Sequence, residues 1–142
     1  MYLDYKAKEL TNLSLGKKKM IARGAMGRKV PYGRITKKDN LYFVENKGDL
    51  LVKAKSKIAD IFFSDKLQRE DSFSLLDKYQ SKLMLNTALK KRFAGKRYLT
   101  LITLTDFILL DNPFEIDKSE YSNVDDWLIV KDINTVMVNQ EV

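Results

Sequence analysis

The chain has 142 residues and a net charge of +7, and it contains no cysteine and no histidine. These two absences exclude disulfides, thiolate nucleophiles, zinc sites of the usual kind and histidine general bases. The first hundred residues hold 24 basic and 10 acidic side chains, and the last 42 residues hold 2 basic and 9 acidic side chains. This asymmetry predicts one electropositive face suited to a polyanion. The alternative is that the basic residues only keep the protein soluble.

The first expected element is a helix over residues 3–15, where apolar residues recur at helical spacing and Gly16 is placed to end the helix. A brief strand over 18–24 follows. The segment 24–40 is rich in glycine and in basic residues, which predicts a loop.

Residues 41–45 and 50–62 are β-prone and flank the turn sequence NKGD, so together they predict a hairpin. Successive side chains of a strand point to opposite faces. One face of the second strand therefore carries Val52, Ala54 and Ile58, and the other carries Lys53, Lys55 and Lys57. We interpret the three lysines as a solvated face that keeps the sheet soluble.

A helix is expected over 73–84 after a cap at Asp71 or Ser72, because its apolar residues form a single stripe. The stripe comprises Leu75, Leu76, Tyr79 and Leu83. A shorter helix is expected over 86–93, capped by the asparagine or threonine at its start and ended by Gly95. The basic cluster at its end complements the helix dipole.

Residues 97–110 are apolar on both faces, which predicts a central strand buried on two sides. The segment 111–117 is expected to turn, and 125–130 and 133–138 to form the last strands. Six or seven strands with two or three helices indicate an α+β fold, built as a small, partly closed barrel or a curled sheet with helices on its rim. We expect residues 1–142 to form a single domain.

The segment that follows the first expected helix contains Gly16, Lys18 and Arg23. This spacing resembles the signature G-x-K-x-x-E-x-R of the ASCH family, a branch of the PUA-like superfamily of RNA-associated domains, with Ile21 where the family has glutamate. The order of the later elements is also similar, so the resemblance covers roughly residues 3–138. It implies a PUA-like small mixed β-barrel with two or three peripheral helices and a cleft for RNA or a nucleobase beside the first helix.

Some members of that family look like nucleoside amidohydrolases or ribonucleases that use the signature lysine and glutamate. Isoleucine can neither accept nor donate a proton, so catalysis of this kind needs another carboxylate. Glu9, Glu45 and Asp39 are the candidates, and Lys18 is the catalytic residue if there is one. An ASCH-type hydrolase is the alternative function.

The leading hypothesis is a basic cleft that binds RNA or a modified nucleotide without catalysis. Ammonium and guanidinium groups suit phosphate, and nearby rings suit a base. The predicted binding residues are Lys17, Lys18, Lys19, Arg23, Arg28, Lys29, Tyr32, Arg34 and Lys37, with Lys38 extending the patch. Tyr42 and Trp127 are candidates for stacking on a base, and core packing is the other interpretation of the tryptophan.

We expect no cofactor and no metal site. The acids near the end of the chain, Asp117, Glu120, Asp125 and Asp126, match no metal-binding motif and are interpreted as surface acids. The sequence shows neither the apolar segment of a signal peptide nor a run of the roughly 18 apolar residues that a membrane helix needs, so a cytoplasmic protein is expected. RNA or a nucleotide is the expected partner, and a protein-interaction module is the third alternative.

Overall fold

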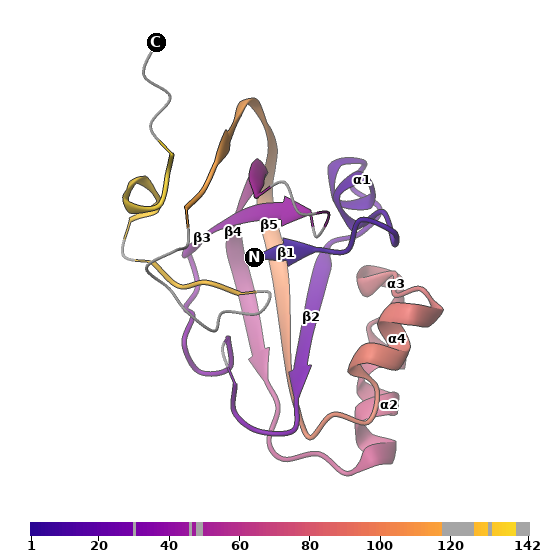
Figure 1. Ribbon diagram of the computed structural model, residues 1–142. Helices are drawn as coiled ribbons and strands as arrows, with labels where there is room; N and C mark the ends of the chain where they lie inside the picture. Colours follow the sequence, from indigo (N-terminus) through magenta and orange to yellow (C-terminus); the bar gives the residue numbers. More distant parts are fainter. Residues whose placement is uncertain (30, 46, 48–49, 118–126, 131, 139–142) are drawn as a thin grey trace.

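Figure 1 shows the computed structural model of the chain, which describes residues 1–29, 31–45, 47, 50–117, 127–130 and 132–138. The described residues form one sheet of five strands, which are β1 (Tyr2–Leu3), β2 (Met20–Ala25), β3 (Asn40–Glu45), β4 (Leu51–Phe63) and β5 (Tyr98–Glu115). They also form the helices α1 (Glu9–Ser14), α2 (Arg69–Lys78), α3 (Gln80–Leu83) and α4 (Thr87–Phe93), and a 3-10 helix at Ile133–Thr135. The strand order is β1-β3-β4-β5-β2, with β1 and β3 parallel and the other pairs antiparallel. The predicted α+β class is confirmed.

The sheet curls, and its two edge strands approach each other without pairing in the described residues. β1 and β2 are these edges. The guanidinium of Arg23 on β2 donates to the carbonyl of Tyr2 on β1 at 2.5 Å, so a side chain links the edges. The described residues form the curled, partly closed sheet that was expected, with five strands where six or seven were expected and four α-helices where two or three were expected.

The sheet is buried on both faces where β2 pairs with the start of β5. The layer of α2, α3 and α4 lies along one face (Figure 1). That side of the core contains Met20, Ala22, Leu76, Leu83, Leu85, Leu89, Phe93, Leu99 and Leu101. The opposite side contains Leu3, Leu13, Ile21, Ile35, Leu41, Phe43, Ala54, Ile58, Ile102 and Trp127. Adjacent residues of β2 thus enter different clusters, because strand side chains alternate.

The predicted hairpin is confirmed as the antiparallel pair β3 and β4. Val52, Ala54 and Ile58 are buried, and Lys55 and Lys57 on the alternate positions are exposed. Lys53 lies on the same face and contacts Glu45. The lysine ladder therefore lies on the side that faces solvent, as the alternation predicts.

The helix expected over 3–15 is wrong in its first half. The structure places Tyr2–Leu3 in a strand parallel to β3, and α1 begins only at Glu9. Leu3 is fully buried in the core, and the amide of Val44 donates to the carbonyl of Met1 at 2.9 Å. Long-range burial and pairing thus override a helical pattern that was correct only for the second half of the segment.

The helices after the hairpin lie where they were expected, but the first of them starts earlier in the sequence than expected. α2 begins at Arg69, so Ser72 lies inside the helix instead of capping it, and its hydroxyl donates to the Arg69 carbonyl. The chain leaves helical geometry at Tyr79, and α3 starts at the next residue, Gln80. α4 agrees with the prediction, since the Asn86 side chain accepts from the amide of Leu89 at 2.8 Å.

The last third of the chain differs most from its prediction. β5 continues to Glu115 through the expected turn, because Phe114 and Glu115 pair with the start of β4. Only its first part is buried on both faces, and Ile108 and Leu109 further along are half exposed. The two expected final strands are absent from the described residues, which instead show a 3-10 helix and a single bridge between Ile116 and Met137.

Parts of several predictions lie outside the described residues. These are Asn46, Gly48 and Asp49 of the hairpin turn, the first two residues of the strand expected over 125–130, and the acids Glu120, Asp125 and Asp126. None of the helices that the structure describes is long and apolar enough to cross a membrane.

Candidate functional site

The signature lysine, Lys18, is buried in an ion pair. Its side chain is 1% exposed, and its Nζ lies 3.2 Å from Oε2 of Glu9, whose side chain is 4% exposed. The same ammonium donates to the carbonyl of Leu83 at the end of α3, where a cation complements unsatisfied helix carbonyls. Oε1 of Glu9 accepts from the amide of Asp4 at 2.8 Å. The pair therefore joins α1, α3 and the segment that leads into β2.

Glu9 is the one of the three candidate carboxylates that the structure places against Lys18. Glu45 instead pairs with Lys53 at 3.0 Å. Asp39 accepts from a backbone amide of its own turn. A lysine and a glutamate thus meet although the signature position holds isoleucine, but both are closed off from solvent.

Burial lowers the pKa of Lys18 below its ordinary value of 10.5, against the opposing effect of the Glu9 carboxylate. The nearby positive charge of Arg23 adds to the lowering. Because the folded protein releases this proton at a lower pH than the unfolded chain does, the unfolded state binds more protons between the two pKa values. The free energy of unfolding that comes from Lys18 therefore rises with pH in that range.

We expect this rise to appear as a difference between the wild type and the variant Glu9→Gln/Lys18→Met, which lacks both charges. Denaturant unfolding at several alkaline pH values up to the ordinary lysine pKa measures it. The wild type should gain stability relative to the variant as the pH increases. A difference that shrinks or stays constant over this range would contradict the lowered pKa.

The signature arginine is also buried and engaged by the protein. Arg23 is 6% exposed, and it donates from Nη1 to the Ala22 carbonyl at 2.6 Å and from Nη2 to the Tyr2 carbonyl at 2.5 Å. Its guanidinium carbon lies 5.8 Å from the ring centroid of Phe93 on α4. Arg23 thus connects both edges of the sheet with the helical layer.

The cations of the signature segment do not share one exposed recess. Lys17 and Lys19 are exposed, whereas Lys18 between them and Arg23 are buried. In the following loop, Lys29 is exposed and Lys37 lies 3.4 Å from Asp60. The nucleotide-binding role of these lysines and of Arg23 stays a prediction.

A second group of predicted residues lies beside the start of β5. The guanidinium carbon of Arg28 is 5.9 Å from the ring centroid of Tyr32 and 5.6 Å from that of Tyr98. The Tyr32 ring packs against Phe63 and Tyr98 at 5.2 and 5.4 Å, and its hydroxyl donates to the carbonyl of Ser64. These contacts give the Tyr32 ring a structural role in an aromatic cluster.

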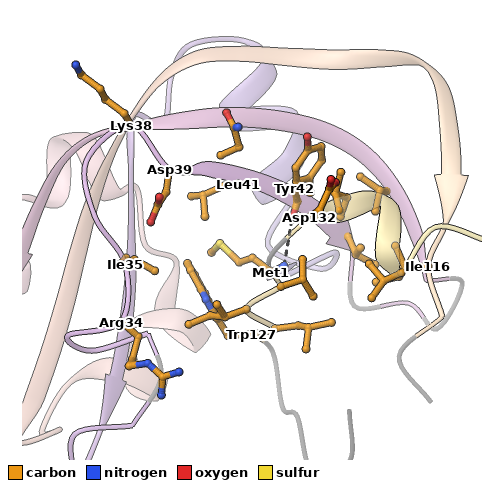
Figure 2. A pocket seen from close by; sticks show the side chains of 18 residues that line it. Met1, Arg34, Ile35, Lys38, Asp39, Leu41, Tyr42, Ile116, Trp127 and Asp132 are labelled. Carbon is orange, nitrogen blue, oxygen red and sulfur yellow. Dashed lines mark hydrogen bonds between the residues drawn. The ribbon is translucent and has the colours of Figure 1, made fainter. Parts of the chain in front are cut away.

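A third group of predicted residues lines a pocket of about 540 Å³ (Figure 2). It lies beside the first half of β3, between the loop that leads into this strand and the segment that contains Trp127. Its apolar lining includes Met1, Ile35, Leu41, Val44, Val52, Ile116 and Trp127. Its polar lining includes Arg34, Lys38, Asp39, Asn40, Tyr42 and Asp132.

Mixed charges surround this apolar lining. The N-terminal amino group donates to the carbonyl of Tyr42 at 3.1 Å, which is the dashed line in Figure 2. Arg34 and Lys38 are exposed cations, and Figure 2 shows the Lys38 side chain directed away from the centre of the group. The carboxylates of Asp39 and Asp132 each accept from a backbone amide of their own turn, at 2.8 and 3.0 Å.

Four of the binding or stacking residues predicted from the sequence line this pocket, namely Arg34, Lys38, Tyr42 and Trp127. Trp127 is 7% exposed and belongs to the core cluster, so its packing role is confirmed, and it also lines the pocket. Sequence reasoning missed Met1 and Ile116 because neither lies in a motif. Asp39, one of the three candidate carboxylates, was the signal in the sequence for this wall, since Asp39 and Asn40 both line the pocket.

The fold of the chain is that of ASCH-domain structures. The crystal structure of ASCH from Zymomonas mobilis matches at 16% identity over 88% of this chain and 80% of its own, with a TM-score of 0.60. A tyrosine-to-phenylalanine mutant of that protein matches at 17% over 88% and 81%, and a serine-to-alanine mutant at 17% over 89% and 80%, both with a TM-score of 0.61. No family model and no curated protein matches the sequence. The likeness in structure confirms the fold that the signature residues predicted.

Proposed function

We propose that the protein binds RNA, and that one nucleotide of a single strand occupies the pocket that contains Arg34, Tyr42 and Trp127. The observation that carries the proposal is the convergence of these three residues around one recess, to which Trp127 comes from a segment distant in the sequence from Arg34 and Tyr42. The sequence predicts Arg34 as a nucleotide-binding residue and gives Tyr42 and Trp127 as candidates for stacking on a base. The fold shared with the ASCH structures also supports RNA as the ligand, because the resemblance to the ASCH family implies an RNA-associated domain.

The size and lining of the pocket suit a nucleotide. Small-molecule sites measure about 300–1,000 Å³ and combine apolar walls with a few polar groups, and this pocket holds about 540 Å³ with such a lining. A base has a flat apolar face and a polar edge. Single-stranded nucleic acids are typically held by aromatic rings on the bases and by cations on the backbone.

The roles of the residues follow from their positions. The Tyr42 side chain is partly exposed and can contact a base, whereas Trp127 offers only the small part of its ring that is not buried in the core. Arg34 is exposed and presents a planar fork that matches phosphate. The Asn40 amide and the Asp39 carboxylate provide hydrogen-bonding groups for the edge of a base.

Trp127 makes the test direct because it is the only tryptophan of the chain. We expect its fluorescence to change on titration with short single-stranded RNA. The apparent affinity should fall with salt, with a log–log slope of about −0.7 for each phosphate contact. Absence of binding at low salt would reject the proposal.

We expect Arg34→Ala to weaken RNA binding by about tenfold to a hundredfold, because a hydrogen bond to a charged group contributes about 1.5–3 kcal/mol. The matched control is Arg97→Ala, which removes an exposed arginine that does not line the pocket. Titration of the tryptophan fluorescence of both variants measures the difference. Equal losses in the two variants would show that only the overall charge matters.

The hydrolase alternative is a weaker proposal. It depends on Lys18, whose ammonium is already occupied by Glu9 and by the Leu83 carbonyl and is 1% exposed. Loss of activity in a Lys18 variant would not separate catalysis from folding. Any assay for hydrolysis of acylated nucleosides or RNA must therefore include the stability of that variant.

A further inference from the structure

A second pocket, of about 360 Å³, lies in the helical layer between α2 and α4. Its lining includes Arg69, Phe73, Asn86, Thr87, Lys90 and Lys91. The helices cover the face of the sheet that is opposite to the cluster containing Trp127 (Figure 1). This pocket is therefore separate from the proposed RNA pocket.

Hydrogen bonds fix the walls of this second pocket. The hydroxyl of Ser72, which is fully buried, accepts from the amide of Gly95 at 2.7 Å and donates to the carbonyl of Arg69 at 2.8 Å. The bond from Gly95 ties α2 to the segment that follows α4. A salt bridge between Lys90 on α4 and Asp77 on α2 joins the helices again. The space between them is part of the folded architecture, because its two walls are held at two points.

The lining has the charge of an anion site. Three of its side chains are cationic, Arg69, Lys90 and Lys91, and it contains no carboxylate among the described residues. Asp77 does not line the pocket, but its carboxylate forms a salt bridge with Lys90 and offsets the charge of that lysine. Lys91 is exposed. The guanidinium carbon of Arg69 lies 5.6 Å from the ring centroid of Phe73. A guanidinium beside a ring presents both a fork for phosphate and an apolar surface for a planar group.

We infer that this pocket binds a small phosphate monoester that carries an aromatic group. The phosphate contacts Arg69 and Lys91, with the Thr87 hydroxyl and the Asn86 amide as further donors. The aromatic group lies against Phe73. The volume, about 360 Å³, is within the range of about 300–1,000 Å³ that is usual for small-molecule sites.

Calorimetric titration of the full chain with phenyl phosphate tests the inference, with inorganic phosphate and phenol as separate arms. We expect phenyl phosphate to bind at least tenfold more tightly than either. Lys91→Ala should weaken its binding about fivefold to tenfold, and Phe73→Leu should remove most of its advantage over inorganic phosphate. The control Lys78→Ala removes an exposed lysine of α2 that does not line the pocket and should leave the affinity unchanged.

Three results would overturn the inference. The first is no binding of phenyl phosphate, and the second is an equal loss in Lys91→Ala and Lys78→Ala, which would indicate diffuse attraction. The third is loss of phenyl phosphate binding in Arg34→Ala, which would place the ligand in the other pocket. Because RNA binding is followed through Trp127 and this titration is not, failure of either proposal leaves the other standing.

Discussion

Replacement of Lys18 by methionine is expected to lower the free energy of unfolding by about 3–5 kcal/mol, because it leaves the buried carboxylate of Glu9 without its cation. Methionine keeps most of the length of the side chain, so packing changes little. The carbonyl of Leu83 also loses its donor. Urea or guanidinium unfolding monitored by circular dichroism measures the loss.

The double variant Glu9→Gln/Lys18→Met separates the ion pair from the rest of the change. It removes both charges, and we expect it to be more stable than Lys18→Met alone, because no unpaired buried charge remains. Lys17→Met is the matched control, since Lys17 is the exposed neighbour and its loss should change stability by less than about 0.5 kcal/mol. If the effects of Glu9→Gln and Lys18→Met on the free energy of unfolding simply add in the double variant, Lys18 and Glu9 do not interact.

Arg23→Met is expected to lower the free energy of unfolding by about 2–4 kcal/mol, because the carbonyls of Ala22 and Tyr2 lose a charged donor. The loss should be greatest at β1, since the bond to Tyr2 links this strand to β2. Amide hydrogen exchange of Val44 reports on this edge, because its amide donates to Met1 at the start of the same segment. We expect this exchange to accelerate more than that of the amides in α4.

Arg28→Met provides the comparison for Arg23. Arg28 is exposed and contacts only the faces of two rings in the described contacts, so its loss should cost about 1 kcal/mol or less. If Arg23→Met is as stable as Arg28→Met and exchange of Val44 does not change, the guanidinium does not hold the two edges together.

These expectations change how the signature is interpreted. Lys18 and Arg23 keep their positions in the ASCH signature, yet each binds to carbonyls or a carboxylate of its own protein. A ligand could reach them only if these contacts opened. Binding defects in variants of either residue must therefore be compared with the stability of the same variants.

Local periodicity was sufficient for the elements in the middle of the chain. The alternation from Val52 to Ile58 correctly predicted a strand with its lysines on the side facing solvent, and Asn86 correctly marked the start of α4. In both cases the sequence within a few residues determines the geometry, since the strand repeat and the helix cap depend on near neighbours. The fold class and the resemblance to the ASCH family could be predicted from the sequence because both depend on the order of such elements along the chain.

By itself, then, the sequence determined the hairpin, the helical layer and the central strand, and it supplied the residue types on which the proposed nucleotide site rests. Only the tertiary structure decided that Leu3 belongs to a strand, that β5 continues to Glu115, and that Glu9 neutralises Lys18. It also decided that Arg34 and Trp127 line one pocket. The physical reason is common to all of these. Each depends on contacts between segments distant in the chain, where burial and pairing outweigh local preference, and no spacing within one segment encodes which partner it meets.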